Sequence, residues 1–145
     1  MRITKENINK FIEGTTMNCR NKFIGVTTMN CRNKGISHIE FIPEGITHLH
    51  CGDNKLTKLP KLPESLRNLN CYSNKLTELP KLPESLIYFD CSNNKLTTLP
   101  KLPEGLIYLN CYDNNLPYPI TIENLKEHNT LIKRKEILEK IRIYH

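Results

Sequence analysis

Six cysteines and five histidines give this sequence its main capacity for metal or redox chemistry. Two of the histidines, His48 and His50, lie just before a cysteine, and five cysteines recur at intervals of twenty residues: Cys31, Cys51, Cys71, Cys91 and Cys111. Thiolates and imidazoles bind zinc, and two neighbouring thiols can form a disulfide. Both chemistries require the sulfur atoms to converge, so the spacing decides whether either applies.

The cysteine spacing argues against both kinds of site. Zinc-binding cysteines come in pairs about two to four residues apart, and on a strand His48 and His50 project to the face opposite Cys51. Disulfides would need neighbouring side chains to turn toward each other in an oxidising compartment. We therefore predict reduced thiols that pack as small buried hydrophobic groups, and a structural role for Cys19 in a duplicated segment.

Four asparagines share the twenty-residue period and are the next candidates for chemistry: Asn54, Asn74, Asn94 and Asn114. An amide inside a turn can bond backbone groups that would otherwise be buried without partners, and we predict this structural role. The sequence contains no serine-hydrolase, zinc-protease or phosphate-loop motif. The prediction is therefore a non-enzymatic protein with no cofactor and no metal.

A twenty-residue template, LxxLxCxxNxLxxLPxLPEx, positions these residues and recurs across residues 26–117. In LRNLNC, Leu69 and Cys71 alternate with Asn68 and Asn70, which predicts a short strand with alternating inward and outward side chains. In LPKLPES, the prolines exclude a helix interior, and leucines three residues apart fit an extended, polyproline-like return path. Stacked copies predict one parallel sheet, since a single coil cannot bury enough surface to fold alone.

The sequence divides into an array with a cap at each end. We predict an N-terminal cap over residues 1–25, with a helix from Thr4 to Gly14. Residues 26–117 form the array of about 4.5 repeats, and residues 118–145 form the C-terminal cap.

A C-terminal helix is predicted to start at Thr121 and to run toward Tyr144. Four apolar residues share one of its faces, with Leu131 and Ile137 alongside: Leu125, Ile132, Leu138 and Ile141. Laid over the last coil, this helix would hide the open edge of the sheet. The alternative is that it docks on a partner or on an acidic membrane surface.

The template resembles the leucine-rich repeat family in its short, bacterial-type form, as in YopM-like and IpaH-like effector repeat domains and giant-virus leucine-rich repeat proteins. The resemblance covers residues 26–117. It implies an α+β repeat solenoid with short parallel strands on the concave face, an extended polyproline-like convex side, a short N-terminal cap and a C-terminal capping helix. It also implies binding of other macromolecules. IpaH-like effectors carry a separate ubiquitin-ligase domain, for which 145 residues leave no room.

Outward strand positions differ from coil to coil while inward positions repeat, and this contrast indicates a binding surface. Tyr88 and Tyr108 share one column, with Ile87 and Ile107 beside them, and tyrosine and arginine often anchor interfaces. The alternative is that tyrosine simply suits an exposed strand. The predicted protein-binding residues are His48, His50, Arg67, Asn70, Tyr72, Tyr88, Asp90, Tyr108, Asn110 and Tyr112.

The net charge of +6 lies mainly in the two ends, since residues 46–117 hold eight Lys or Arg against seven Asp or Glu. No basic cluster is interleaved with aromatic residues, which argues against nucleic-acid binding. No apolar stretch suits a signal peptide or a membrane span. We expect an intracellular, cytoplasmic monomer that binds a protein ligand, in the host cytoplasm for a viral or effector protein. The alternative is a targeting subunit that acts with a separate ubiquitin-ligase chain.

Overall fold

The computed structural model describes residues 1–14 and 27–144, so Cys19 and the duplicated copy Thr15–Lys22 lie outside the described residues. Ten short elements follow one another in this part of the chain. They are β1 (Arg2–Ile3), the 3-10 helix η1 (Ile8–Phe11), β2 (Ile12–Gly14), β3 (Thr27–Asn30), β4 (His38–Ile39), β5 (His48–His50), β6 (Asn68–Asn70), β7 (Tyr88–Asp90), β8 (Tyr108–Asn110) and α1 (Leu125–Ile143).

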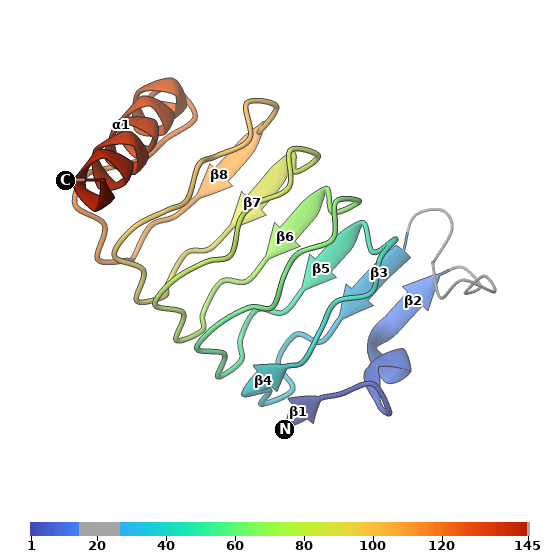
Figure 1. Ribbon diagram of the computed structural model, residues 1–145. Coiled ribbons are helices and arrows are strands. Elements are labelled where there is room, and N and C mark those ends of the chain that lie inside the picture. Colours follow the sequence, from blue (N-terminus) through green and yellow to red (C-terminus); the bar gives the residue numbers. More distant parts are fainter. Residues whose placement is uncertain (15–26, 145) are drawn as a thin grey trace.

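Six strands form one sheet in the order β2-β3-β5-β6-β7-β8, and β1 pairs with β4 in a second, small sheet. Every neighbouring pair from β3 to β8 is parallel. The register is twenty residues, so that Leu49 lies beside Leu69 and Phe89 beside Leu109. Figure 1 shows the resulting coils stacked side by side, with α1 at the far end. The predicted solenoid of parallel strands with a C-terminal helix is confirmed.

The core lies between this sheet and the return segments. The middle residue of a strand points inward, and Leu49, Leu69 and Phe89 are 0% exposed, whereas the residues on either side of each are partly exposed. Burying such a side chain contributes about 1.5–3 kcal/mol. Ordering the backbone costs about 1–2 kcal/mol per residue. One coil with a handful of inward residues cannot offset the ordering of its twenty, so the coils must stack.

The return segments contain neither helix nor strand, as the prolines predict. Residues 71–87 contain only bends and a turn between β6 and β7, and Leu76 and Leu82 are buried. In that turn, Ser85 Oγ donates to two carbonyl oxygens of the preceding coil, those of Glu64 and Leu66, at 2.7 Å each. The turn residues therefore tie one coil to the next.

The N-terminal cap differs from the predicted helix. Only Ile8–Phe11 is helical, as a 3-10 turn whose N-cap is Asn7 rather than Thr4. The next residues, Ile12–Gly14, form β2 and pair antiparallel with β3. The first strand of an array exposes N–H and C=O groups at its edge, and an added strand satisfies them where a helix could not.

The C-terminal helix starts at Leu125, later than the predicted Thr121. The N–H of Thr121 donates to Asn124 Oδ1 at 2.9 Å, and this side-chain bond closes a turn before the helix. Leu125 and His128 are buried and Ile132 is partly buried, but Leu138 and Ile141 are 65% and 50% exposed. The prediction of one buried face along the whole helix is therefore wrong beyond Ile132.

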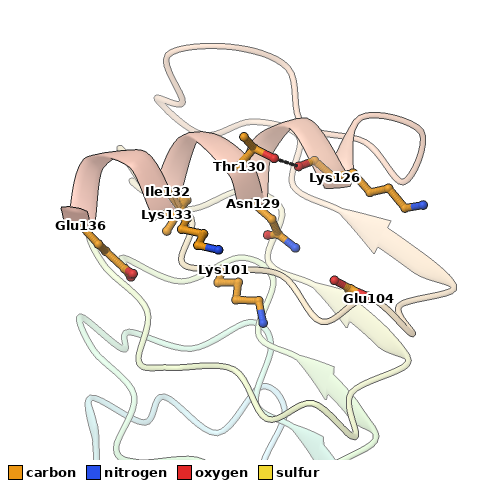
Figure 2. A pocket seen from close by; sticks show the side chains of 8 residues that line it. All are labelled: Lys101, Glu104, Lys126, Asn129, Thr130, Ile132, Lys133 and Glu136. Atoms are coloured by element: carbon orange, nitrogen blue, oxygen red, sulfur yellow. Dashed lines mark hydrogen bonds between the residues drawn. The ribbon is translucent and has the colours of Figure 1, made fainter. Parts of the chain in front are cut away.

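The contacts of α1 go to the return segment that precedes β8, which explains why only its first turns are buried. His128 Nε2 lies 3.0 Å from the carbonyl oxygen of Pro100, and Asn129 bonds both the N–H and the C=O of Leu102, at 2.8 and 2.7 Å. Figure 2 shows Asn129 on the side of α1 that faces this segment. A cavity of about 600 Å³ lies here; its charged lining is mixed, with Lys101, Glu104, Lys126, Lys133 and Glu136.

Within the described residues, no hydrogen bond joins α1 to β8, and the helix caps the core through the return segment that precedes this strand. Residues 120–123, which precede the helix, lie beside the strand edge without forming backbone hydrogen bonds to it. None of the helices described here is long and apolar enough to cross a membrane.

Candidate binding face

The outward side chains of β5 to β8, together with the residues that flank each strand, form one surface that we call the strand face. The register aligns its columns: His48, Asn68, Tyr88 and Tyr108 in one, and His50, Asn70, Asp90 and Asn110 in the next. Arg67 precedes β6, and Tyr72 and Tyr112 follow two strands. The structure thus places all ten predicted residues on the strand face, partly or fully exposed.

Tyr88 and Tyr108 form a stacked pair. Their ring centroids lie 4.2 Å apart and the rings are parallel to within 3°. Tyr88 is partly buried. This burial raises the pKa of Tyr88, and the nearby Tyr108 raises it further. Tyr108 is 40% exposed, and Ile107 next to it is 76% exposed. Two rigid rings and an apolar side chain therefore remain open to a ligand at this end of the face.

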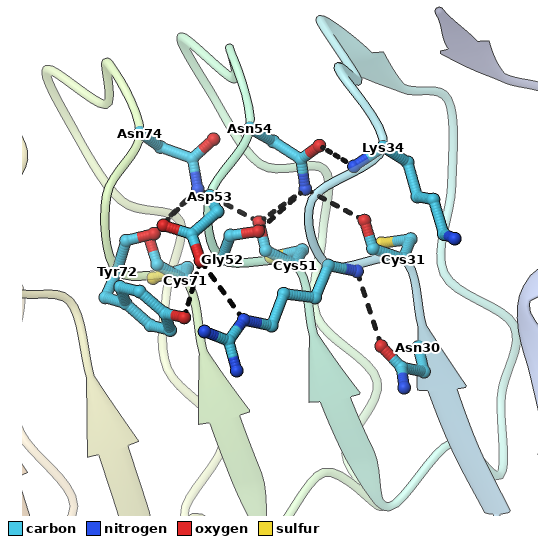
Figure 3. Close-up of polar contacts among 11 residues, drawn as sticks. Asn30, Cys31, Lys34, Cys51, Gly52, Asp53, Asn54, Cys71, Tyr72 and Asn74 are labelled. Atoms are coloured by element: carbon cyan, nitrogen blue, oxygen red, sulfur yellow. Dashed lines mark hydrogen bonds and ion pairs between the residues drawn. The ribbon is translucent and has the colours of Figure 1, made fainter.

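Tyr72 belongs to a different, internally bonded group. Its hydroxyl donates to Asp53 Oδ2 at 2.7 Å, and Arg32 Nε donates to the same oxygen at 3.1 Å (Figure 3). The Arg32 guanidinium also lies 5.2 Å from the centroid of the Tyr72 ring. The Tyr72 hydroxyl and then Arg32 hold the pKa of Asp53 below its usual range. Since its carboxylate is already paired, this group is less available to a partner than Tyr88 and Tyr108.

Gly52 makes this arrangement possible. A Cβ atom at Gly52 would lie 2.6 Å from Cε1 of Tyr72, which is closer than side-chain atoms can approach. The equivalent position holds Tyr72 itself in the next coil and Tyr112 in the last. The Tyr72 ring therefore covers Gly52 and reaches back one coil to Asp53.

The polar members of the strand face bond locally. The His48 ring Nδ1 lies 2.9 Å from Thr47 Oγ1, and the rings of His48 and His50 are 6.4 Å apart. Asp90 Oδ1 accepts from Ser92 Oγ at 2.6 Å, and its other oxygen accepts from Asn110 Nδ2 at 3.4 Å. The Oδ1 atoms of Asn68 and Asn70 are buried and have no hydrogen-bond partner, which leaves two acceptors in the middle of the face.

The repeated asparagines have the structural role predicted for them. Asn54 Nδ2 donates to the carbonyl oxygens of Cys31, Cys51 and Gly52, and its Oδ1 accepts from the N–H of Lys34 (Figure 3). The same Oδ1 also accepts from the N–H of Ile36. Asn74, Asn94 and Asn114 repeat these donations one coil at a time. Each amide thus joins two coils.

The five described cysteines are free and buried in the core, as predicted. Burial raises the pKa of Cys31 from 9.0 to about 12 and shifts the other four in the same direction. Such thiols stay protonated near neutral pH and are poor nucleophiles. In the part of the chain that the structure describes, no cluster of three His, Cys, Asp or Glu residues could hold a metal ion.

Sequence reasoning missed Arg32 and Gly52 as members of the strand face. The available signal was a glycine at a position that holds tyrosine in the next coil. A second regularity also went unnoticed: one position of the turn has a positive φ in every coil, between 51° and 54°. This position precedes the repeated asparagine, or Lys34 in the first coil, and holds Asn33, Asp53, Ser73, Asn93 and Asp113. Asn and Asp tolerate this conformation well, so these positions serve the turn first.

Parallel strands, twenty-residue coils and helix-free return segments define a leucine-rich repeat solenoid with a C-terminal capping helix. Among solved structures, the chain is similar to YopM from Yersinia enterocolitica WA-314, with a TM-score of 0.58 and 38% sequence identity. The similarity covers 60% of this chain and 19% of that one, so it spans about a fifth of the YopM chain. No family model matches the sequence, and no curated protein matches it.

Proposed function

We propose that this protein is a non-enzymatic interaction module that binds a protein ligand on the strand face. In line with the effector resemblance, the ligand is a host protein met in the cytoplasm, and the module acts as a monomer. Its anchors are the stacked tyrosines and their neighbours, while the polar columns from His48 to Asn110 fix the orientation of the ligand.

The observation that carries this proposal is the apolar end of the strand face. Ile107 and Tyr112 are 76% and 75% exposed, next to the stacked pair of Tyr88 and Tyr108. Aromatic side chains that are already fixed lose little conformational freedom on binding and bring a large contact area. The scaffold does not require large apolar side chains at positions 107, 108 and 112. The equivalent positions of other coils hold Thr47, Asn68 and Gly52.

The test is a measurement of affinity after the partner has been isolated from a eukaryotic lysate with the full chain. We expect Tyr88→Ala and Tyr108→Ala each to cost about 2 kcal/mol or more of binding free energy, roughly thirtyfold in affinity. Their melting temperatures should change little, because exposed strand positions contribute within about 1 kcal/mol. Calorimetry and melting curves on the same variants provide both quantities.

The matched control changes two exposed lysines on the return side, Lys61→Ala and Lys81→Ala, which should leave binding nearly unchanged. A folded Tyr88→Ala/Tyr108→Ala variant with unaltered affinity would move the binding site off the strand face. Recovery of ubiquitin-ligase chains with the bait would favour the alternative function as a targeting subunit.

A further inference from the structure

Neighbouring coils are joined by a fixed set of backbone hydrogen bonds. The N–H of Cys71 donates to Asp90 O and the N–H of Cys91 to Asn110 O, at 2.8 and 2.9 Å. The turn adds two more, such as Asn93 N–H to Tyr112 O and Asn94 N–H to Asp113 O. In the other direction, the carbonyl oxygen of Ile87 accepts from Ile107 and Tyr108. Outside the strand ladder, each coil therefore offers three backbone donors to the coil that follows it, and two of its carbonyl oxygens, here those of Ile87 and Leu96, accept from that coil.

The last coil offers the same groups and has no coil to follow it. Within the described residues, no hydrogen bond engages four of its backbone groups: the carbonyl oxygen of Ile107 and the N–H groups of Cys111, Asp113 and Asn114. Leu109, the inward residue of β8, is only partly buried, whereas Leu69 and Phe89 are 0% exposed. The edge thus keeps the bonding pattern of an interior coil.

A groove runs along this edge. It has a volume of about 260 Å³, with residues of β8 and its flanks on one side and the segment 120–123 on the other. The lining includes apolar and aromatic side chains, among them Tyr108, Leu109, Tyr112 and Ile122, but polar atoms make up more of its surface than apolar ones. Because the chain walls the groove on both sides, its shape suits a single extended segment better than the flat surface of a folded protein.

The charge of the groove also indicates which kind of peptide segment would bind in it. Glu123 is the only charged residue in the lining. Interior coils carry a lysine after the repeated asparagine, as Lys75 and Lys95, but the last coil has Asn115 there. Sheet edges are commonly protected by lysine, and the last coil has no lysine at this position. The edge therefore favours a basic segment.

We propose that the β8 edge is a second binding site, which accepts an extended, basic segment of a partner protein as an added parallel strand. The segment donates a backbone N–H to Ile107 O and accepts from the N–H groups of Cys111 and Asp113, as β8 does with β7. An apolar side chain of the segment covers Leu109, and a basic side chain lies near Glu123. This site adjoins the strand face, since Tyr108 and Tyr112 also line the groove, but it is defined by the backbone groups of the β8 edge, and its use requires no ligand on the strand face.

The probe is a fluorescent peptide with the sequence of Leu66–Lys75, LRNLNCYSNK, in which Cys71→Ala prevents oxidation. It is basic, and the β6–β7 register shows how such a sequence pairs in this sheet. With the full-length protein we expect saturable binding by fluorescence anisotropy. N-methylation of the peptide at both Arg67 and Asn68 removes the two donors that face Ile107 O and should weaken binding about tenfold or more. N-methylation at Leu69, whose N–H faces away, should have little effect.

Protein variants locate the peptide on the edge. Ile107→Lys places a positive charge there and should weaken binding about tenfold, whereas Ile87→Lys, the same column one coil earlier, should change it less than about twofold. Glu123→Gln should weaken binding about threefold, and Glu104→Gln, which changes a carboxylate that does not line the groove, should not.

Three results would overturn the proposal. One is the absence of saturable binding up to about 1 mM peptide, the weakest affinity worth considering. Another is binding that neither methylation at Arg67 and Asn68 nor Ile107→Lys affects, which would place the peptide elsewhere. The third is a concentration-dependent dimer by light scattering that Ile107→Lys abolishes, since a second copy of the chain would then occupy the edge.

Discussion

Asn74 shows at the scale of one residue how the scaffold is held together. Its Nδ2 donates to the carbonyl oxygens of Cys51, Cys71 and Tyr72, and its Oδ1 accepts from the N–H of Leu56. The side chain is 9% exposed. These backbone groups have no easy access to water, so their hydrogen bonds depend on this one amide.

Replacing Asn74 should therefore affect folding and leave the binding surface chemically unchanged. We expect Asn74→Ala to lower the free energy of unfolding by about 3 kcal/mol, since several buried groups lose partners that each contribute about 1 kcal/mol or more. Asn115→Ala is the control, because that side chain is exposed, and it should cost less than about 0.5 kcal/mol. Urea unfolding measures both. Equal losses in the two variants would contradict the role given to the amide column.

The buried thiols predict a pH dependence of stability at the alkaline end. Their pKa values are raised in the folded state, with that of Cys31 going from 9.0 to about 12. The unfolded chain therefore loses these protons first as the pH rises. The stabilisation is complete below about pH 9 and is lost progressively between about pH 9 and 12.

We accordingly expect the melting temperature to fall steeply above about pH 9. Cys71→Ala should be less stable at neutral pH and should show a smaller decline, because it has one fewer buried thiol. Thermal melts of both proteins across this range check the expectation. Parallel curves for the two proteins would show that lysine and tyrosine titration accounts for the decline instead.

At the scale of elements, the sequence predicts the coils well and the caps poorly. Strand, return path and asparagine column follow from a pattern that recurs, so each coil supports the interpretation of the next. A cap occurs once, and its structure depends on the surface that it covers. Ile12–Gly14 fits a helical pattern but forms β2, because the edge of β3 requires strand partners. Leu138 and Ile141 fit an apolar helix face, but they lie beyond the turns of α1 that bond the array and are exposed.

The two halves of α1 should therefore contribute differently to stability. Deleting residues 121–145 removes Leu125 and His128 from the core and leaves both backbone groups of Leu102 without Asn129. We expect the melting temperature to fall by about 10 °C, which corresponds to roughly 4 kcal/mol in a chain of this size. Deleting only residues 133–145, all exposed or outside the described residues, should change it by less than about 2 °C.

Scanning calorimetry of the two truncated proteins distinguishes a cap from a docking helix. A protein lacking residues 121–145 that melts like the full chain would mean that α1 does not stabilise the array. A large loss on removing only residues 133–145 would mean that the exposed half has a partner within the protein.

The candidate site was predictable only in part. Variation among the coils identified the outward columns, because inward positions are fixed by packing and outward ones are not. The contacts among these side chains could not be read from the pattern. Tyr72 bonds Asp53 because Gly52 leaves room for its ring, whereas Tyr88 has a tyrosine beside it and stacks. The same residue type therefore has two different environments on one face.

At the scale of the whole molecule, the twenty-residue register has a consequence for synthesis. Every coil finds its strand partners only twenty residues away, a separation that favours rapid pairing. On the ribosome each coil can therefore join the sheet as it emerges, in the order β3, β5, β6, β7, β8, with α1 arriving last. At about 5–20 residues per second, a growing array would expose an edge like that of β8 for roughly 1–4 s per coil. The folded protein thus keeps at β8 the unpaired strand edge that every earlier coil exposes once during translation.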